Sequence, residues 1–383
     1  MQFPLTSPST AAQPATSAHR VIFIDLARAL AVLFMLYGHT ISALLAPAYQ
    51  TGTWFAVWQF QRGLTSSLFL MLSGFAFSVA TTRHWALHVR PSRAVLRRLR
   101  RFALFIVLGY ALHFPVADVA QLSGLPDERW RAFLAVDVLQ LIGVSLTAVQ
   151  LLVLAARSPQ VFAFASVVLA AAVTSATPIA WQTDWTARLP LGIASYLSPA
   201  TGSLFPIFPW AAYVLTGAAL GQIYSRWGAG HLGRFMLGVL LLPGAVLIAA
   251  APFVRRSAAA GSAWSVPSEV LVRAGACLLI LCGIAFVSRR LSRLPHVFGA
   301  VAQETLLIYF VHLCIVYGSV WNPGLSQVYG GMLGPLPVVG LVAALVASMA
   351  ALAWYWNQWK HTSPRTARWA AVATGGLLAV KLL

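Results

Sequence analysis

Three ionisable residues stand within one apolar stretch of the chain, IDLARALAVLFMLYGHT at residues 24–40. Arg28 and His39 are 11 residues apart, which is close to three turns of an α-helix, so their side chains share nearly one face. Asp25 precedes Arg28 by about one turn. A neutral imidazole takes and returns a proton near physiological pH. The spacing therefore points to a histidine general base that shares a helical stripe with a fixed cation.

A general base of this kind suits acyl transfer. His39 would deprotonate a hydroxyl or an amine, which would then attack a thioester carbonyl while an arginine or another donor steadies the oxyanion. The sequence contains no Gly-x-Ser-x-Gly, P-loop or dinucleotide-binding motif, and no metal-ligand spacing. Cys277, Cys282 and Cys314 match neither zinc nor redox spacing and are interpreted as packing residues. No metal cofactor is expected.

The composition predicts the environment of this histidine. Hydrophobic residues make up 59% of the 383 and charged residues only 9%, with a mean hydropathy of +0.78. Soluble domains are about one-quarter charged, so we expect an integral membrane protein. Its spans should be helices, because backbone exposed to lipid must satisfy its own hydrogen bonds. The net charge of +18 comes from arginines between apolar segments and indicates membrane topology rather than nucleic-acid binding.

Apolar runs of the length needed to cross a bilayer predict an all-α polytopic bundle of about eleven transmembrane helices. Residues 1–19 are rich in Ser, Thr, Pro and Ala and are predicted to form a flexible tail, followed by a single domain at 20–383. The expected spans are 22–46, 62–82, 98–117, 132–155, 159–180, 203–225, 233–253, 267–288, 302–321, 333–357 and 366–383.

The arginines predict the orientation. Residues 83–101 hold seven arginines, and alternate connections after them carry most of the remaining Lys and Arg. By the positive-inside rule, we expect a cytoplasmic N-terminus and an external C-terminus.

Five stretches carry a resemblance to a known family. They are RVIFIDLARALAVLFMLYGHT, FQRGLTSSLFLMLSGFAF, VDVLQLIGVSL, SLFPIFPWAAYVLTGAALG and ETLLIYFVHLCIVYG. Together they resemble the transmembrane acyltransferase superfamily, and within it the bacterial relatives of heparan-alpha-glucosaminide N-acetyltransferase, from about residue 20 to residue 320. The resemblance implies an enzyme that moves an acetyl group from cytoplasmic acetyl-CoA, or another acyl-CoA donor, to a sugar across the membrane.

Position by position, Asp25, Arg28 and His39 match the first helix of that family, and Arg62 matches an arginine that opens the second. The animal enzymes carry a functional histidine in the loop after the first of these helices, but residues 40–61 contain none. The acceptor, an amine or a hydroxyl on an envelope glycan or glycolipid, is therefore left open.

Ionisable residues inside spans are costly and are candidates for function. We expect His39 to act as general base, Arg28 to position the donor or offset charge, and Asp25 to orient Arg28. The remaining candidates are grouped by the substrate they would contact. Those expected to bind substrate are Arg62, Tyr309, His312, Asp137 and Arg273, with Tyr309 and His312 lining the acceptor side, and those for the donor's phosphates are Arg97, Arg98 and Arg101.

Other interpretations stay open. Asp25 with Arg28 also fits a self-neutralising ion pair, His312 an interhelical hydrogen bond, and His113 a structural role. One alternative function is an O-acyltransferase of the acyltransferase family 3 type, acting on surface polysaccharide. Another is a proton-coupled transporter or lipid flippase. Inverted repeats in the sequence would indicate such a protein, and none are found. The expected partners are membrane lipid and a sugar-containing acceptor, without nucleic acid. A dimer is left open.

Overall fold

The computed structural model describes residues 22–256 and 263–381, so the predicted tail at 1–19 lies outside the described residues. The longer helices are α1 (Ile22–Leu44), α2 (Gly52–Thr82), α4 (Arg93–Leu112), α6 (Val138–Ala156), α7 (Pro159–Gln182), α9 (Ile207–Ile223), α11 (Leu242–Arg256), α12 (Val266–Ser288), α14 (Thr305–Tyr317), α16 (Pro335–Thr362) and α17 (Pro364–Val380). The shorter ones are α3 (Trp85–His88), α5 (Asp127–Leu134), α8 (Leu191–Ala194), α10 (Leu232–Phe235), α13 (His296–Gln303) and α15 (Leu325–Tyr329).

Strands are almost absent from the part of the chain that the structure describes. β1 (Gly318–Ser319) pairs antiparallel with β2 (Asn322–Pro323), with Gly318 opposite Pro323. This short hairpin follows α14 directly. The prediction of an all-α membrane bundle is confirmed.

Seven helical segments within the described ranges are long and apolar enough to cross a membrane, or eight if the bent pair α13 and α14 forms one span. The predicted count of eleven is not established by these segments. Of the remaining helices, α4 begins with a run of arginines, and α9 and α17 have 17 residues each. A helix of that length rises about 25 Å, which is short for a hydrocarbon core of about 30 Å.

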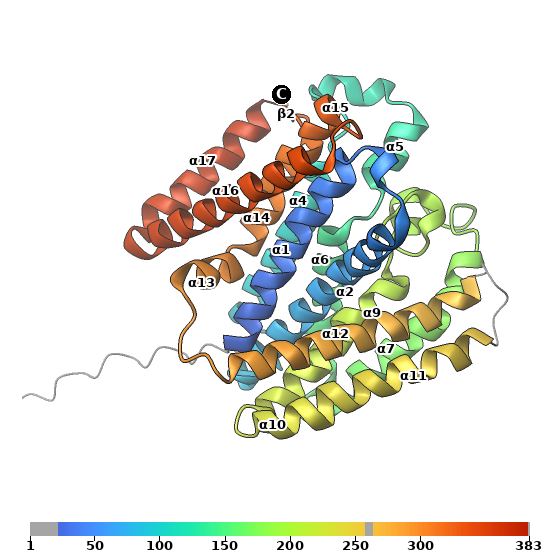
Figure 1. Ribbon diagram of the computed structural model, residues 1–383, viewed down its shortest axis with the longest axis vertical. Helices are drawn as coiled ribbons and strands as arrows, with labels where there is room; N and C mark the ends of the chain where they lie inside the picture. The colour runs from blue at the N-terminus through green and yellow to red at the C-terminus, as the bar shows by residue number, and fades with distance from the viewer. Residues whose placement is uncertain (1–21, 257–262, 382–383) are drawn as a thin grey trace, which may run out of the picture.

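The first helix lies at the centre of the bundle (Figure 1). α1 packs against α2 and α12 on one side and against α13, α14 and α16 on the other. Its buried side chains, among them Phe23, Ala27, Ala31 and Met35, belong to the main hydrophobic cluster. Because α1 lies between these two groups of helices, its ionisable side chains are kept away from lipid.

Glycines let α2 and α9 approach each other closely. A Cβ atom added at Gly74 would lie 1.9 Å from the carbonyl oxygen of Val214, and one at Gly217 would lie 1.9 Å from that of Met71. At Gly221 the corresponding distance, to the oxygen of Phe75, is 2.4 Å. Gly217 and Gly221 stand four residues apart in the sequence, a spacing of small residues that allows close helix packing, and the contacts of both with α2 fix α2 against α9.

The arginine-rich connection between α2 and α4 lies at one end of the bundle, which is called the basic end below. A cavity of about 590 Å³ at this end brings Phe23 at the start of α1 together with Thr82 and Arg83 at the end of α2 and with Ser288 at the end of α12. Close by in the fold, Arg98 donates to Thr81 Oγ1 over 2.8 Å. The arginine-rich connection between α2 and α4 therefore lies at the end of the bundle where α1 begins.

Candidate active site

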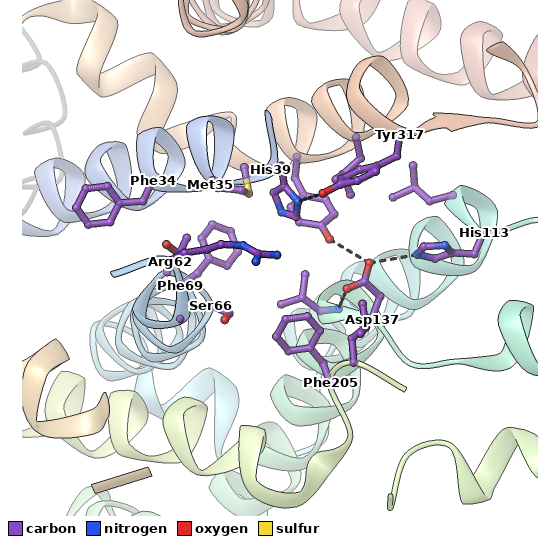
Figure 2. A pocket seen from close by; sticks show the side chains of 18 of the residues that line it. Phe34, Met35, His39, Arg62, Ser66, Phe69, His113, Asp137, Phe205 and Tyr317 are labelled. Atoms are coloured by element: carbon purple, nitrogen blue, oxygen red, sulfur yellow. Dashed lines mark hydrogen bonds and ion pairs between the residues drawn. The ribbon is translucent and has the colours of Figure 1, made fainter. Parts of the chain in front are cut away.

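The larger cavity lies toward the opposite end of α1 and has a volume of about 800 Å³. Figure 2 shows it between α1, α2, the end of α4, the start of α6 and α14. Aromatic and aliphatic side chains form much of its wall, and nine polar or ionisable residues also line it. The polar or ionisable ones are His39, Gln59, Arg62, Thr65, Ser66, His113, Asp137, Tyr309 and Tyr317. Apolar walls with few convergent polar groups are typical of small-molecule sites.

His39 enters this cavity from the last third of α1. Its Nδ1 lies 3.0 Å from the phenol oxygen of Tyr317, at the end of α14, as the dashed line in Figure 2 marks. In the tautomer in which Nδ1–H donates to Tyr317, Nε2 presents the lone pair that a general base needs. The predicted base is thus held by one hydrogen bond inside a cavity large enough for a substrate.

His312 stands behind His39. Its ring centroid is 5.4 Å from that of His39, and its side chain is fully buried. Nδ1 lies 2.8 Å from the carbonyl oxygen of Ile308, and a carbonyl only accepts, so Nδ1 carries the proton. Nε2, with its lone pair, has no hydrogen-bond partner among the described residues. His312 is not one of the residues that line the cavity, and it contacts the predicted base directly.

Asp137 is the centre of a second polar group. Its Oδ2 lies 3.1 Å from Nε2 of His113 and accepts a hydrogen bond from Tyr309 OH at 3.4 Å. Its Oδ1 accepts from the backbone N–H of Val138 over 2.7 Å, at the first residue of α6. The carboxylate is therefore held from three sides. The sequence singled out Asp137 and Tyr309, and the structure brings them together.

Arg62 occupies another wall of the cavity. Its guanidinium carbon lies 5.8 Å from the ring centroid of Trp58, one turn earlier on α2. Figure 2 shows the guanidinium pointing into the space between His39 and Asp137. A planar cation in this position has the donors to stabilise negative charge that develops on a carbonyl oxygen.

The remaining predicted residues lie away from the cavity. Asp25 and Arg28 belong to the first two turns of α1 and are not among its lining residues. Arg28 is about 16 Å from His39 along the helix axis. Arg273 stacks over Trp210 at 5.8 Å and lies 3.5 Å from Glu269, behind the wall formed by α2.

Arg97, Arg98 and Arg101 lie in the first half of α4, at the basic end of the bundle. Arg98 contacts Thr81 and stacks 5.1 Å from the ring centroid of Phe77. None of the three lines the larger cavity. Within the described ranges, no group of three or more His, Cys, Asp or Glu side chains could hold a metal ion.

Among the polar lining residues that sequence reasoning missed, two contact predicted site residues, His113 and Tyr317. His113 was interpreted as structural because it stands at a helix end just before Pro115, and Tyr317 carried no signal at all. Both acquire their partners through tertiary contacts, to Asp137 and His39 respectively. The one available signal for His113 was an ionisable side chain close to a span.

Comparison with known families agrees with this architecture. The model of the heparan-alpha-glucosaminide N-acetyltransferase catalytic domain matches residues 20–235, more than half of the chain. The matched part includes His39, Arg62, His113 and Asp137, whereas α14 lies beyond it. A search of curated proteins found no match. The protein has helices that are long and apolar enough to span a membrane, and more than half of its chain matches this catalytic domain. It therefore belongs to the heparan-alpha-glucosaminide N-acetyltransferase family of membrane acetyltransferases.

Proposed function

We propose that the protein transfers an acetyl or other short acyl group from cytoplasmic acyl-CoA to an amine or hydroxyl of a sugar in an envelope glycan or glycolipid. The observation that carries the proposal is the placement of His39, held by Tyr317 inside the 800 Å³ cavity, in a chain of this acetyltransferase family. The cavity offers a base, a carboxylate, a guanidinium and aromatic walls against which a sugar ring can pack.

The reaction follows from these groups. His39 takes the proton of the attacking amine or hydroxyl, whose lone pair forms a bond to the thioester carbonyl carbon. Negative charge develops on the carbonyl oxygen, and Arg62 is placed to stabilise it. When the C–S bond breaks, the proton held by His39 passes to the departing CoA thiolate. The products are the acylated sugar and CoA–SH, so one base serves both half-steps.

The two ends of the bundle give the donor and the acceptor separate approaches. The positive-inside rule favours a cytoplasmic position for the arginine-rich end, in a bacterial inner membrane with the N-terminus inside and the C-terminus outside. Acyl-CoA would then approach from the side of Arg97, Arg98 and Arg101, with Arg28 between that end and His39. The sugar would enter from the opposite side, near Asp137 and Tyr309.

His312 would support His39, and Arg273 would act behind the acceptor wall. Surrounding lipid is the expected partner, and we retain a dimer as part of the proposal.

The direct test is release of free CoA from acetyl-CoA by purified protein, with and without a panel of amino sugars and envelope glycans. We expect acceptor-stimulated release that His39→Gln reduces by about 100-fold or more. His231→Gln is the matched control, because His231 is exposed at the basic end. The absence of both acetyl-CoA binding and CoA release in folded wild-type protein would refute the enzyme and favour the transporter alternative. Mass spectrometry of the product would distinguish N-acylation from O-acylation.

A further inference from the structure

Two contacts on neighbouring residues of α2 link His39 to an arginine outside the cavity. A Cβ atom added at Gly38, the residue before His39, would lie 3.7 Å from Cγ of Arg62. One added at Gly63, the next residue of α2, would lie 3.9 Å from the guanidinium carbon of Arg273. Gly63 lines the cavity and puts no side chain between that guanidinium and the space. His39 and Arg273 therefore flank the same turn of α2.

Arg273 stands on a rim of aromatic and apolar side chains. Its guanidinium carbon is 5.8 Å from the ring centroid of Trp210, whose ring is 4.8 Å from that of Phe205. Phe205 lines the cavity, and so does Leu204, which is 69% exposed. Figure 2 shows Phe205 and Arg62 facing the same space. The rim thus leads from the cation of Arg273 into the cavity.

The register of α2 and α9 gives the level of this rim. Gly217 meets Met71 and, four residues further along both helices, Gly221 meets Phe75, so the two helices run parallel. The same register puts the first residue of α9 level with Gln61. α2 begins nine residues before Gln61, about 14 Å higher. The rim residues just before α9 therefore lie well below the end of α2.

This level lies inside the hydrocarbon of the bilayer. Gln61 accepts a hydrogen bond from the hydroxyl of Tyr37 on α1, and α1 continues for seven residues, about 10 Å, beyond Tyr37. The 23 residues of α1 rise about 34 Å, close to the thickness of the hydrocarbon core. The rim therefore stands within the leaflet opposite the basic end. The exposed side chains on the turns of α2 above it include the apolar Trp54, Val57 and Phe60.

A cation at this depth is stabilised by an anionic partner. Arg273 contacts Glu269, one turn earlier on α12, through Nη2 alone and at 3.5 Å, and one-third of the arginine side chain is exposed. A guanidinium carries five N–H donors, so this single long contact leaves donors for a phosphate, which arginine binds in a bidentate manner.

We propose that the space between α2 and the start of α9 admits a lipid-linked acceptor from the leaflet opposite the basic end, with Arg273 binding the phosphate that joins the sugar to its lipid. The lipid chain lies against Leu204 and the exposed apolar side chains of α2, and the sugar extends past Gly63 toward His39. The role of the acceptor rests on the proposed acyl transfer, which this inference narrows to phosphate-linked glycolipids.

The lipid-phosphate site can be tested without turnover. The probe is farnesyl phosphate, and the readout is the Tm of the full chain in detergent, which a ligand of the native state raises. We expect farnesyl phosphate to raise the Tm, and equal concentrations of farnesol or inorganic phosphate to raise it much less. Arg273→Gln should raise the Kd for farnesyl phosphate by about 10-fold or more. Arg256→Gln is the matched control, because Arg256 also stacks on an aromatic ring, 5.5 Å from the centroid of Phe253.

A purely structural role for Arg273 makes a different prediction. If Arg273 served only to pair with Glu269, Glu269→Gln would weaken farnesyl phosphate binding as Arg273→Gln does. In the proposed site the carboxylate competes with the phosphate, so Glu269→Gln should leave the affinity unchanged or increase it. Equal losses in the two variants would therefore overturn the inference.

A turnover experiment separates this inference from the proposed function. Farnesyl phosphate should compete with the acceptor in CoA release by wild-type protein, and Arg273→Gln should need about 10-fold more of it. Undiminished binding in Arg273→Gln, or equal stabilisation of wild type by inorganic phosphate, would overturn the inference and leave acyl transfer intact. Farnesyl phosphate binding without CoA release to any acceptor would refute the acyltransferase and the acceptor role, while the lipid-phosphate site would stand.

Discussion

The phenol oxygen of Tyr317 lies 3.0 Å from Nδ1 of His39, joining the end of α14 to α1 across 278 residues of sequence. The two rings also meet edge to face, with centroids 5.5 Å apart. Tyr317 therefore fixes the orientation of the proposed base, and when its oxygen accepts from Nδ1–H, Nε2 of His39 is left with the lone pair that a base needs.

Removing that hydroxyl should impair turnover more than binding. Tyr317→Phe keeps the ring and removes the hydrogen bond, which contributes about 1 kcal/mol. We expect kcat to fall by about 5- to 10-fold with little change in KM for acetyl-CoA, measured by steady-state CoA release. Tyr355→Phe is the matched control, because Tyr355 is 67% exposed on α16. A rise in KM with unchanged kcat would show that Tyr317 binds substrate instead.

The close approach of α2 and α9 makes a second prediction. Gly217→Ala would place a methyl group against the Met71 carbonyl, so the two helices must move apart, at a cost of about 1–3 kcal/mol. The apparent Tm in detergent should drop by several degrees. Gly340→Ala, on α16, meets no atom within 4 Å and should leave the Tm unchanged or slightly raise it. Equal Tm values for the two variants would contradict the packing described.

A third prediction concerns Glu304, a buried carboxylate between α13 and α14, whose axes differ in direction by 78°. It accepts hydrogen bonds from Lys360 at 2.8 Å and from Asn357 at 3.0 Å, both on α16. Lys360→Met leaves a buried charge without its cation and should cost on the order of 2–3 kcal/mol, since the lysine is partly exposed.

Removing both charges should be milder. In the double variant Glu304→Gln/Lys360→Met no uncompensated charge remains, so the Tm should recover part of the loss. Glu269→Gln is the control, because its ion pair with Arg273 is exposed at the surface and should contribute little. A double variant that is less stable than either single variant would argue against a charge-pairing role.

The fourth prediction separates donor binding from chemistry. A ligand that binds only the native state raises its stability, by about 2.7 kcal/mol at a concentration of 100 Kd. If Arg28 positions the donor, acetyl-CoA should raise the Tm of His39→Gln as it does that of wild type, but raise that of Arg28→Gln much less. Arg293→Gln, an exposed arginine at the basic end, should respond like wild type. An undiminished response in Arg28→Gln would remove Arg28 from the donor site.

Much of the fold could be predicted from the sequence, because lipid imposes simple rules on composition and segment length. Hydropathy predicted a span at residues 22–46, and the structure has α1 at Ile22–Leu44. The site could be predicted only in part. Helical periodicity places Arg28 and His39 on one face of α1. It does not show where along the helix the cavity lies, and in the structure only His39 reaches it.

Contacts between distant segments escaped prediction for a different reason. His113 and Asp137 are 24 residues apart, and Lys360 and Glu304 are 56 apart. Which side chains meet depends on how the helices pack, and no local pattern encodes that. His113 was therefore interpreted as structural, although tertiary packing places it beside Asp137.

The site is assembled from two unequal parts of the chain, and this has an evolutionary consequence. The matched catalytic region ends at residue 235, yet Tyr309 and Tyr317 wall the cavity and His312 stands behind His39. Substitutions in α14 can therefore reshape the pocket without altering the segment by which the family is recognised. A fragment limited to the matched region, residues 20–235, would lack one wall of this cavity.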